Sequence, residues 1–117
     1  MITDRLFHSQ EFFQPTNDGE PVRSVVYESA EAVIVAWHIN PGQRIAAHFH
    51  PHGQDTWTIL SGRGCYQFNK SGDTIMINAG DVVVAQIGSV HGVVKNEMEP
   101  LRFISVVTPA DAGYEPL

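Results

Sequence analysis

The sequence predicts an all-β domain built from antiparallel strands. Seven short segments are rich in β-branched and aromatic residues, which is the usual composition of strands. They are residues 22–27, 33–39, 56–60, 65–69, 74–78, 82–87 and 101–108. Turns that contain glycine separate them, and no helical periodicity runs through the middle of the chain. Many short strands joined by tight turns favour a sandwich or a barrel.

Turn sequences mark the boundaries between the predicted strands. They lie at residues 40–42 (Asn-Pro-Gly), 61–64 (Ser-Gly-Arg-Gly), 70–72 (Lys-Ser-Gly), 78–80 (Asn-Ala-Gly) and 88–89 (Gly-Ser). Before the first strand, residues 2–13 allow a helical turn, and a polar loop follows them. After the last strand, a tail with two prolines is predicted to lie over the surface. We therefore expect an N-terminal arm and loop (1–21), a barrel (22–109) and a C-terminal tail (110–117).

The composition limits the partners and the compartment. Seven lysines and arginines against thirteen acidic residues give a net charge of −6, and no basic patch is visible. We therefore expect neither nucleic acid nor membrane as a partner. One cysteine, Cys65, excludes an intramolecular disulfide, and no apolar run approaches the roughly 20 residues of a membrane-spanning helix. The first residues lack the apolar region of a signal peptide, so a cytoplasmic protein is predicted.

The segment 33–39 is apolar on both of its alternating faces. One face carries Val33, Val35, Trp37 and Ile39, and the other carries Ile34 and Ala36. In a lone small barrel the outer face should be polar. We therefore expect a homodimer, in which a second subunit covers the outside of one sheet. The alternative is that the N-terminal arm covers this face within one chain.

Three histidines and one aspartate have the spacing of a metal site. His48 and His50 are two residues apart, so in an extended strand both imidazoles would point to one side. Asp55 lies five residues beyond His50, close enough for a loop to bring its carboxylate to the same centre. His91 follows a turn later in the chain. Such a set suits a divalent transition metal.

Two motifs around these residues resemble those of the cupin superfamily, and the resemblance covers residues 33–109. The first motif is Gly42-x5-His48-x-His50-x4-Asp55-x6-Gly62, and the second is Gly80-x5-Gln86-x-Gly88-x2-His91 followed by Asn96. The chain is most similar to the small single-domain conserved-barrel (RmlC-like) cupins, many of which lack an assigned reaction. Three residues depart from the pattern: Asp55 replaces the usual glutamate, Gln86 replaces the usual proline, and Asn96 comes one residue late.

The resemblance implies an antiparallel double-stranded β-barrel, or jelly roll, with one divalent transition metal per chain. Iron, manganese, nickel, zinc and cobalt are all compatible with His48, His50, Asp55 and His91 as ligands. A metalloenzyme acting on a small molecule, of the dioxygenase, isomerase or lyase type, is favoured because this ligand set leaves positions for substrate. The alternative is a non-enzymatic module that senses or stores a metal or small ligand. A vestigial site is disfavoured because the ligand set is complete.

Gln54 competes with Asp55 for the fourth ligand position. Counting back from Gly62, Asp55 shares a strand face with Trp57 and Ile59, whereas Gln54 has the opposite parity. Gln54 could reach the site only through a bulge. An ionised carboxylate is also the better ligand for a hard dication. We therefore predict Asp55 and keep Gln54 as the alternative.

Other residues are candidates for a pocket around this site. Inward parity places Trp57 on one strand, and Phe103 and Ser105 on the last strand, inside the barrel. Cupins of similar size that open unsaturated uronate rings carry an acid near the position of Ser105. This chain does not, which weakens the transfer of that reaction.

Three further side chains each have two interpretations. Arg44 shares the parity of His48, and either orients an anionic substrate or pairs with a surface carboxylate. His52 is either a partner of the ligands at the pocket mouth or a loop histidine in solvent. His38 lies either on the barrel wall or against a carbonyl, and parity does not choose between these positions.

Overall fold

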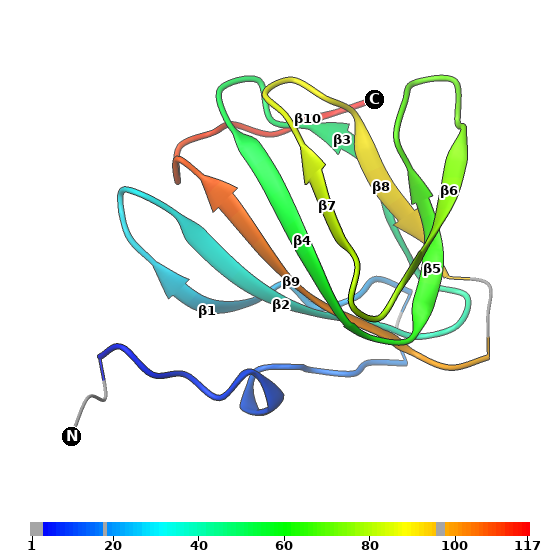
Figure 1. Ribbon diagram of the computed structural model, residues 1–117, viewed down its shortest axis with the longest axis horizontal. Coiled ribbons are helices and arrows are strands. Elements are labelled where there is room, and N and C mark those ends of the chain that lie inside the picture. Colours follow the sequence, from blue (N-terminus) through cyan, green and yellow to red (C-terminus); the bar gives the residue numbers. More distant parts are fainter. Residues whose placement is uncertain (1–3, 18, 96–97) are drawn as a thin grey trace.

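Two five-stranded antiparallel sheets pack face to face (Figure 1). The computed structural model describes residues 4–17, 19–95 and 98–117. The strands are β1 (Ser24–Glu28), β2 (Val33–Ile39), β3 (Arg44–Phe49), β4 (Gln54–Ser61), β5 (Arg63–Gln67), β6 (Thr74–Asn78), β7 (Val82–Ala85), β8 (His91–Val94), β9 (Leu101–Thr108) and β10 (Glu115–Pro116). The predicted antiparallel all-β class is confirmed.

All seven predicted strands form, and β3, β8 and β10 add to them. The sequences of β3 and β8 contain alanine, glycine and histidine, so local propensity does not mark them; their strand neighbours hold them in the sheet. Of the predicted helical segment, the described residues form only a 3-10 helix, η1 (Ser9–Glu11). Residues 2 and 3 of that segment lie outside the described part. In the described ranges, no helix has the length and hydrophobicity to cross a bilayer.

Strands that are distant in sequence become neighbours in the sheets. One sheet has the order β1-β2-β9-β4-β7, and the other has the order β10-β3-β8-β5-β6. Thus β9 lies between β2 and β4, and β8 lies between β3 and β5. The two predicted histidine segments, on β3 and β8, are therefore adjacent, and β4 belongs to the sheet that faces them.

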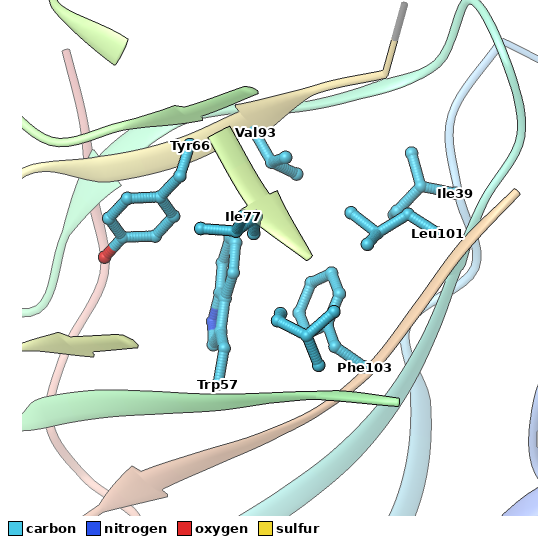
Figure 2. Close-up of a cluster of buried hydrophobic side chains, with 8 residues drawn as sticks. Ile39, Trp57, Tyr66, Ile77, Val93, Leu101 and Phe103 are labelled. Carbon is cyan, nitrogen blue, oxygen red and sulfur yellow. The ribbon is translucent and has the colours of Figure 1, made fainter. Parts of the chain in front are cut away.

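An apolar cluster fills the space between the sheets (Figure 2). Its buried members are Ile39, Trp57, Ile59, Tyr66, Ile77, Val93, Leu101 and Phe103. The ring of Trp57 stacks on Phe103, with centroids 4.2 Å apart, and meets Tyr66 edge to face at 5.2 Å. Burial of a side chain as large as leucine or phenylalanine stabilises the fold by roughly 1.5–3 kcal/mol. This cluster therefore holds Trp57 in a fixed orientation.

The N-terminal arm runs along the outer side of β1 and β2 (Figure 1), and it contacts β9 through Phe13. Phe13 is buried there, and the guanidinium of Arg102 lies 4.8 Å from its ring centroid. The amide of Gln14 donates to Ser24 at 3.1 Å, and Ala36, which pairs with Ser24, is fully buried. The arm therefore covers part of the apolar outer face within one chain, which is the alternative that the sequence left open.

The C-terminal tail is part of the second sheet. Its strand β10 pairs with the end of β3. Ala112 is buried, and its carbonyl accepts a hydrogen bond of 2.8 Å from the backbone of His52. Gly53 is needed at this contact because a side chain there would overlap Ala112. The tail thus lies firmly against the loop that follows β3, while the division of the chain at residues 21 and 109 stays a prediction.

Candidate metal centre

The four side chains predicted as metal ligands meet between the two sheets. His48, near the end of β3, is the direct ladder partner of His91, the first residue of β8. His50 follows β3 immediately, and Asp55 is the second residue of β4 in the facing sheet. All four are at least nine-tenths buried, and one ligand atom from each lies within 4.8 Å of the others.

Strand parity places Asp55 in this cluster and keeps Gln54 out of it. Along β4, Asp55, Trp57 and Ile59 are buried, whereas Gln54 is exposed. This is the alternation that the sequence predicts. On β3 the simple count fails because the register shifts between Ile45 and His48, which is a bulge or irregularity in the ladder.

Backbone carbonyls orient the three imidazole rings. The Nδ1 atoms lie 2.8 Å from the oxygen of Ala46 for His48, 2.6 Å from Gly113 for His50 and 3.0 Å from Ser89 for His91. A carbonyl only accepts, so each Nδ1 carries the proton and donates it. In a neutral ring the remaining nitrogen, Nε2, then has a free lone pair. The three Nε2 atoms therefore offer lone pairs to the cluster.

The carboxylate of Asp55 is the centre of the hydrogen bonds. Ser105 donates to its Oδ1 at 2.7 Å, and Nε2 of His91 lies 3.0 Å from Oδ2. Nε2 of His50 is 3.4 Å from the same oxygen, which is long for a hydrogen bond and leaves mainly an electrostatic contact. Three strands in two sheets thus position this one side chain.

These contacts shift the pKa values in opposite directions. Burial by itself raises the pKa of Asp55, but the contacts from His50, His91 and Ser105 outweigh burial and hold that pKa below its ordinary value of 3.8. Burial lowers the pKa of His48 from 6.5 to about 4, so His48 is neutral at pH 7. The nearby carboxylate of Asp55 is the main cause that raises the pKa of His50.

The donor set fits a cation. With every Nδ1 committed to a carbonyl, lone pairs and a carboxylate face one another, and only protons or a metal ion can make that arrangement favourable. Nε2 of His50 is buried and has no hydrogen-bond partner in the described part of the chain. A metal held by three imidazoles and one carboxylate would satisfy this atom and the others together.

The cluster borders a cavity of about 660 Å³. The predicted pocket residues Trp57, Ser105 and Arg44 line it. The other predicted pocket residues do not. Gln54 and His52 are exposed outside the lining, and Phe103 lies in the core against Trp57. Strand parity placed Phe103 inside the barrel correctly. Parity does not tell how far along the barrel axis a side chain lies, so it could not separate the core from the cavity.

Sequence reasoning missed the part that the two ends of the chain take in this site. Glu20 and Arg23 from the N-terminal side, and Gly113 and Tyr114 from the tail, also line the cavity. The ring of Tyr114 lies 4.9 Å from that of His48, centroid to centroid. The one available signal was an aromatic residue in an otherwise small and polar tail, and that signal does not say where the tail folds.

His38 and Asn96 complete the sequence candidates. His38 is buried on the outward side of β2, where Nε2 lies 2.8 Å from the side chain of Asn40, and Nδ1 accepts a hydrogen bond of 2.9 Å from Arg102. It is therefore a hydrogen-bonded residue beneath the arm and faces away from the cavity. Asn96 of the second motif lies outside the described residues.

Residues 35–107 match the family described as Cupin domain. The chain belongs to the cupin family. This cupin is 47% identical to an uncharacterized conserved protein with a double-stranded β-helix domain from Klebsiella pneumoniae, over 96% of each chain and with a TM-score of 0.91. The cupin, double-stranded β-barrel assignment is thereby confirmed. No curated protein matches the sequence.

More distant structures share the fold alone. The polyketide cyclase RemF from Streptomyces resistomycificus is 17% identical, over 83% of this chain and 70% of its own, with a TM-score of 0.73. A predicted oxalate decarboxylase from Thermotoga maritima is 20% identical, over 89% of this chain and 98% of its own, with a TM-score of 0.74. Their different names agree with the rule that one fold supports many functions.

The lowered pKa of Asp55 predicts how acid affects the metal-free protein. A carboxyl group with a depressed folded pKa adds stability above its ordinary value of 3.8, and that stability is lost as pH falls through the folded value. Asp55→Asn should therefore be less stable than wild type at pH 6, and the difference should shrink towards pH 2. Urea unfolding at several pH values measures it. Asp4→Asn, at an exposed carboxylate of the arm, is the control, and equal acid sensitivity of wild type and Asp55→Asn would contradict the prediction.

Proposed function

We propose that this cupin binds one divalent transition metal per chain through His48, His50, Asp55 and His91, and that it is a metalloenzyme acting on a small molecule. One observation carries the proposal: four buried ligand atoms lie within 4.8 Å of one another, and three of their residues, His48, His50 and Asp55, line a cavity of about 660 Å³. A purely structural metal needs no such cavity, whereas a catalytic site needs room for substrate beside the ligands.

The donor set suits iron, manganese, nickel, zinc or cobalt. When bound, such a metal supplies Lewis-acid polarisation of a substrate oxygen or, if it is redox-active, dioxygen chemistry, so the proposed reaction is of the dioxygenase, isomerase or lyase type. The residues of the chain then have separate tasks. Ser105 fixes the orientation of Asp55, and the carbonyls of Ser89 and Gly113 fix the rings of His91 and His50.

A second candidate is a non-enzymatic module that stores or senses a metal or a small ligand. The depth of the site favours it, because His91 and Asp55 are only 1% and 5% exposed. The two candidates differ in one physical property. In an enzyme an added ligand reaches the metal, and in a closed storage or structural site it does not.

The first prediction from this proposal concerns metal content. Wild-type protein purified without a histidine tag should contain about one transition metal per chain, since one ligand set is present. His48→Ala and His91→Ala should reduce the content to near zero and stay folded, because the apolar cluster supplies the fold. His52→Ala is the matched control, as His52 is an exposed histidine outside the cavity lining. Elemental analysis measures the metal, and circular dichroism checks the fold; full occupancy in either cluster variant would refute the assignment.

The second prediction separates the two candidate functions. In cobalt-substituted protein, azide should shift the visible absorption bands if the cavity gives access to the metal. Asp55→Ala should retain weaker metal binding through the imidazoles and show altered bands, while Gln54→Ala should match the wild type. Bands that do not respond to azide would exclude the enzyme and support the storage or sensor function.

We also propose that the protein is a homodimer. Support comes from the outer face of β4 and β7, where Leu60, Val82 and Val84 are 46%, 58% and 51% exposed. The contacts of the N-terminal arm lie on the other half of that sheet, so this apolar band is available to a second subunit. The proposed partners are thus a second copy of the chain and a small molecule, in a cytoplasmic protein whose single cysteine forms no intramolecular disulfide.

The dimer has a direct test. Val84→Lys places a charge in the apolar band and should convert the dimer into a monomer in light scattering at micromolar concentration. Ile75→Lys is the matched control, because Ile75 is an equally exposed aliphatic residue on β6 of the other sheet. A wild-type monomer, or the same effect from both variants, would contradict this interface.

A further inference from the structure

We propose that the cavity binds a small organic acid, with its carboxylate held by Arg44 and Arg23 and a second oxygen next to the four-residue cluster. This inference rests on the proposed function and adds a substrate class to it.

Two guanidinium groups reach the cavity from opposite sheets. Arg44 is the first residue of β3, and Arg23 immediately precedes β1. Both are exposed and both line the cavity, so they stand where it opens to solvent. Neither has a carboxylate oxygen within 4.0 Å among the described residues, which favours the first interpretation of Arg44, a contact with an anionic substrate. Their charges are therefore available to a ligand.

The charge of the lining also favours an anion. Its ionic side chains are Arg23, Arg44, Glu20 and Asp55, which sum to zero when the histidines are neutral. A bound divalent metal makes the sum positive, although the chain as a whole carries −6. A concave site of this kind concentrates the field of its own charges, so a small anion is attracted locally against the charge of the whole molecule. The planar guanidinium also matches a carboxylate in a bidentate pair.

The positions along β3 set the size of the ligand. Arg44 precedes His48 by four residues on β3, but the irregularity in the ladder reduces that separation to three steps of the partner strand, roughly 10 Å. A ligand that contacts both Arg44 and the cluster would therefore have a short carbon body. The part of the lining that β2 contributes from the other sheet is apolar and includes Val33, Val35 and Trp37. An acid with a short carbon body matches such a wall.

Trp57 adds an apolar surface near the cluster. It lines the cavity and is 1% exposed, and its indole nitrogen is buried out of reach of a ligand atom. The ring therefore offers packing area to the carbon body of a ligand, and the two guanidinium groups and the cluster are the polar groups that the cavity offers.

The test compares keto acids with amides of the same shape. Pyruvate with pyruvamide, and levulinate with levulinamide, are titrated calorimetrically into zinc-loaded and metal-free protein. At least one acid should bind about tenfold more tightly than its amide, as expected for a charge-assisted hydrogen bond. Arg44→Gln and Arg23→Gln should each bring that ratio close to one. Arg63→Gln, at an exposed arginine of β5 outside the lining, should leave the ratio unchanged.

Several results would overturn the inference. They are an acid–amide ratio near one in wild type, a ratio that survives in both cavity variants, an equal loss in Arg63→Gln, or no binding of either pair at millimolar concentration. Metal content is measured on the same samples. If wild type takes up no metal, the proposed metalloenzyme fails, while the acid–amide ratio in metal-free protein still decides whether the arginines hold a carboxylate.

Discussion

The buried carboxylate of Asp55 is the group on which the rest of the site depends. An ionised carboxylate between two sheets loses its hydration, which costs several kcal/mol unless positive charge and hydrogen bonds replace the water. Ser105 donates one such hydrogen bond from β9, and a cation shared with His91 and His50, a proton or a metal ion, supplies the positive charge from β8 and the end of β3. One buried charge therefore links the two sheets and explains why four polar side chains persist next to an apolar core.

The two ends of the chain complete the cavity that the barrel strands form. The arm covers part of the outer face of one sheet, and the residues that follow it contribute Arg23 to the cavity. The tail adds β10 to the other sheet and brings the carbonyl of Gly113 to His50, at a sequence separation of 63 residues. Each segment therefore contributes groups to the cavity and also covers part of the barrel.

The fold and the inner site were predictable because strand alternation is a local rule. Because side chains alternate between the two faces of a strand, counting from residues a few positions away placed Asp55 inside the barrel and Gln54 outside it. The irregularity between Ile45 and His48 shows the limit of such counting, since one shift in register changes the faces that follow. The contact between Gly113 and His50 was not predictable, because a backbone carbonyl has the same chemistry in every residue and only the tertiary path of the tail selects this one.

Trp57 connects the stability of the core with the geometry of the site. Its ring stacks on Phe103 on the core side and lies 5.8 Å from the ring of His91, at 78°, on the side of the cluster. Because close-packed interiors leave such a ring little freedom, the ring of Trp57 keeps one position beside His91 whether or not a ligand is present. A wall that is fixed before binding loses little entropy when a ligand packs against it. The core therefore restricts Trp57 in the same way that the backbone carbonyls restrict the three imidazoles, and the whole site is ordered by contacts that lie outside the cavity.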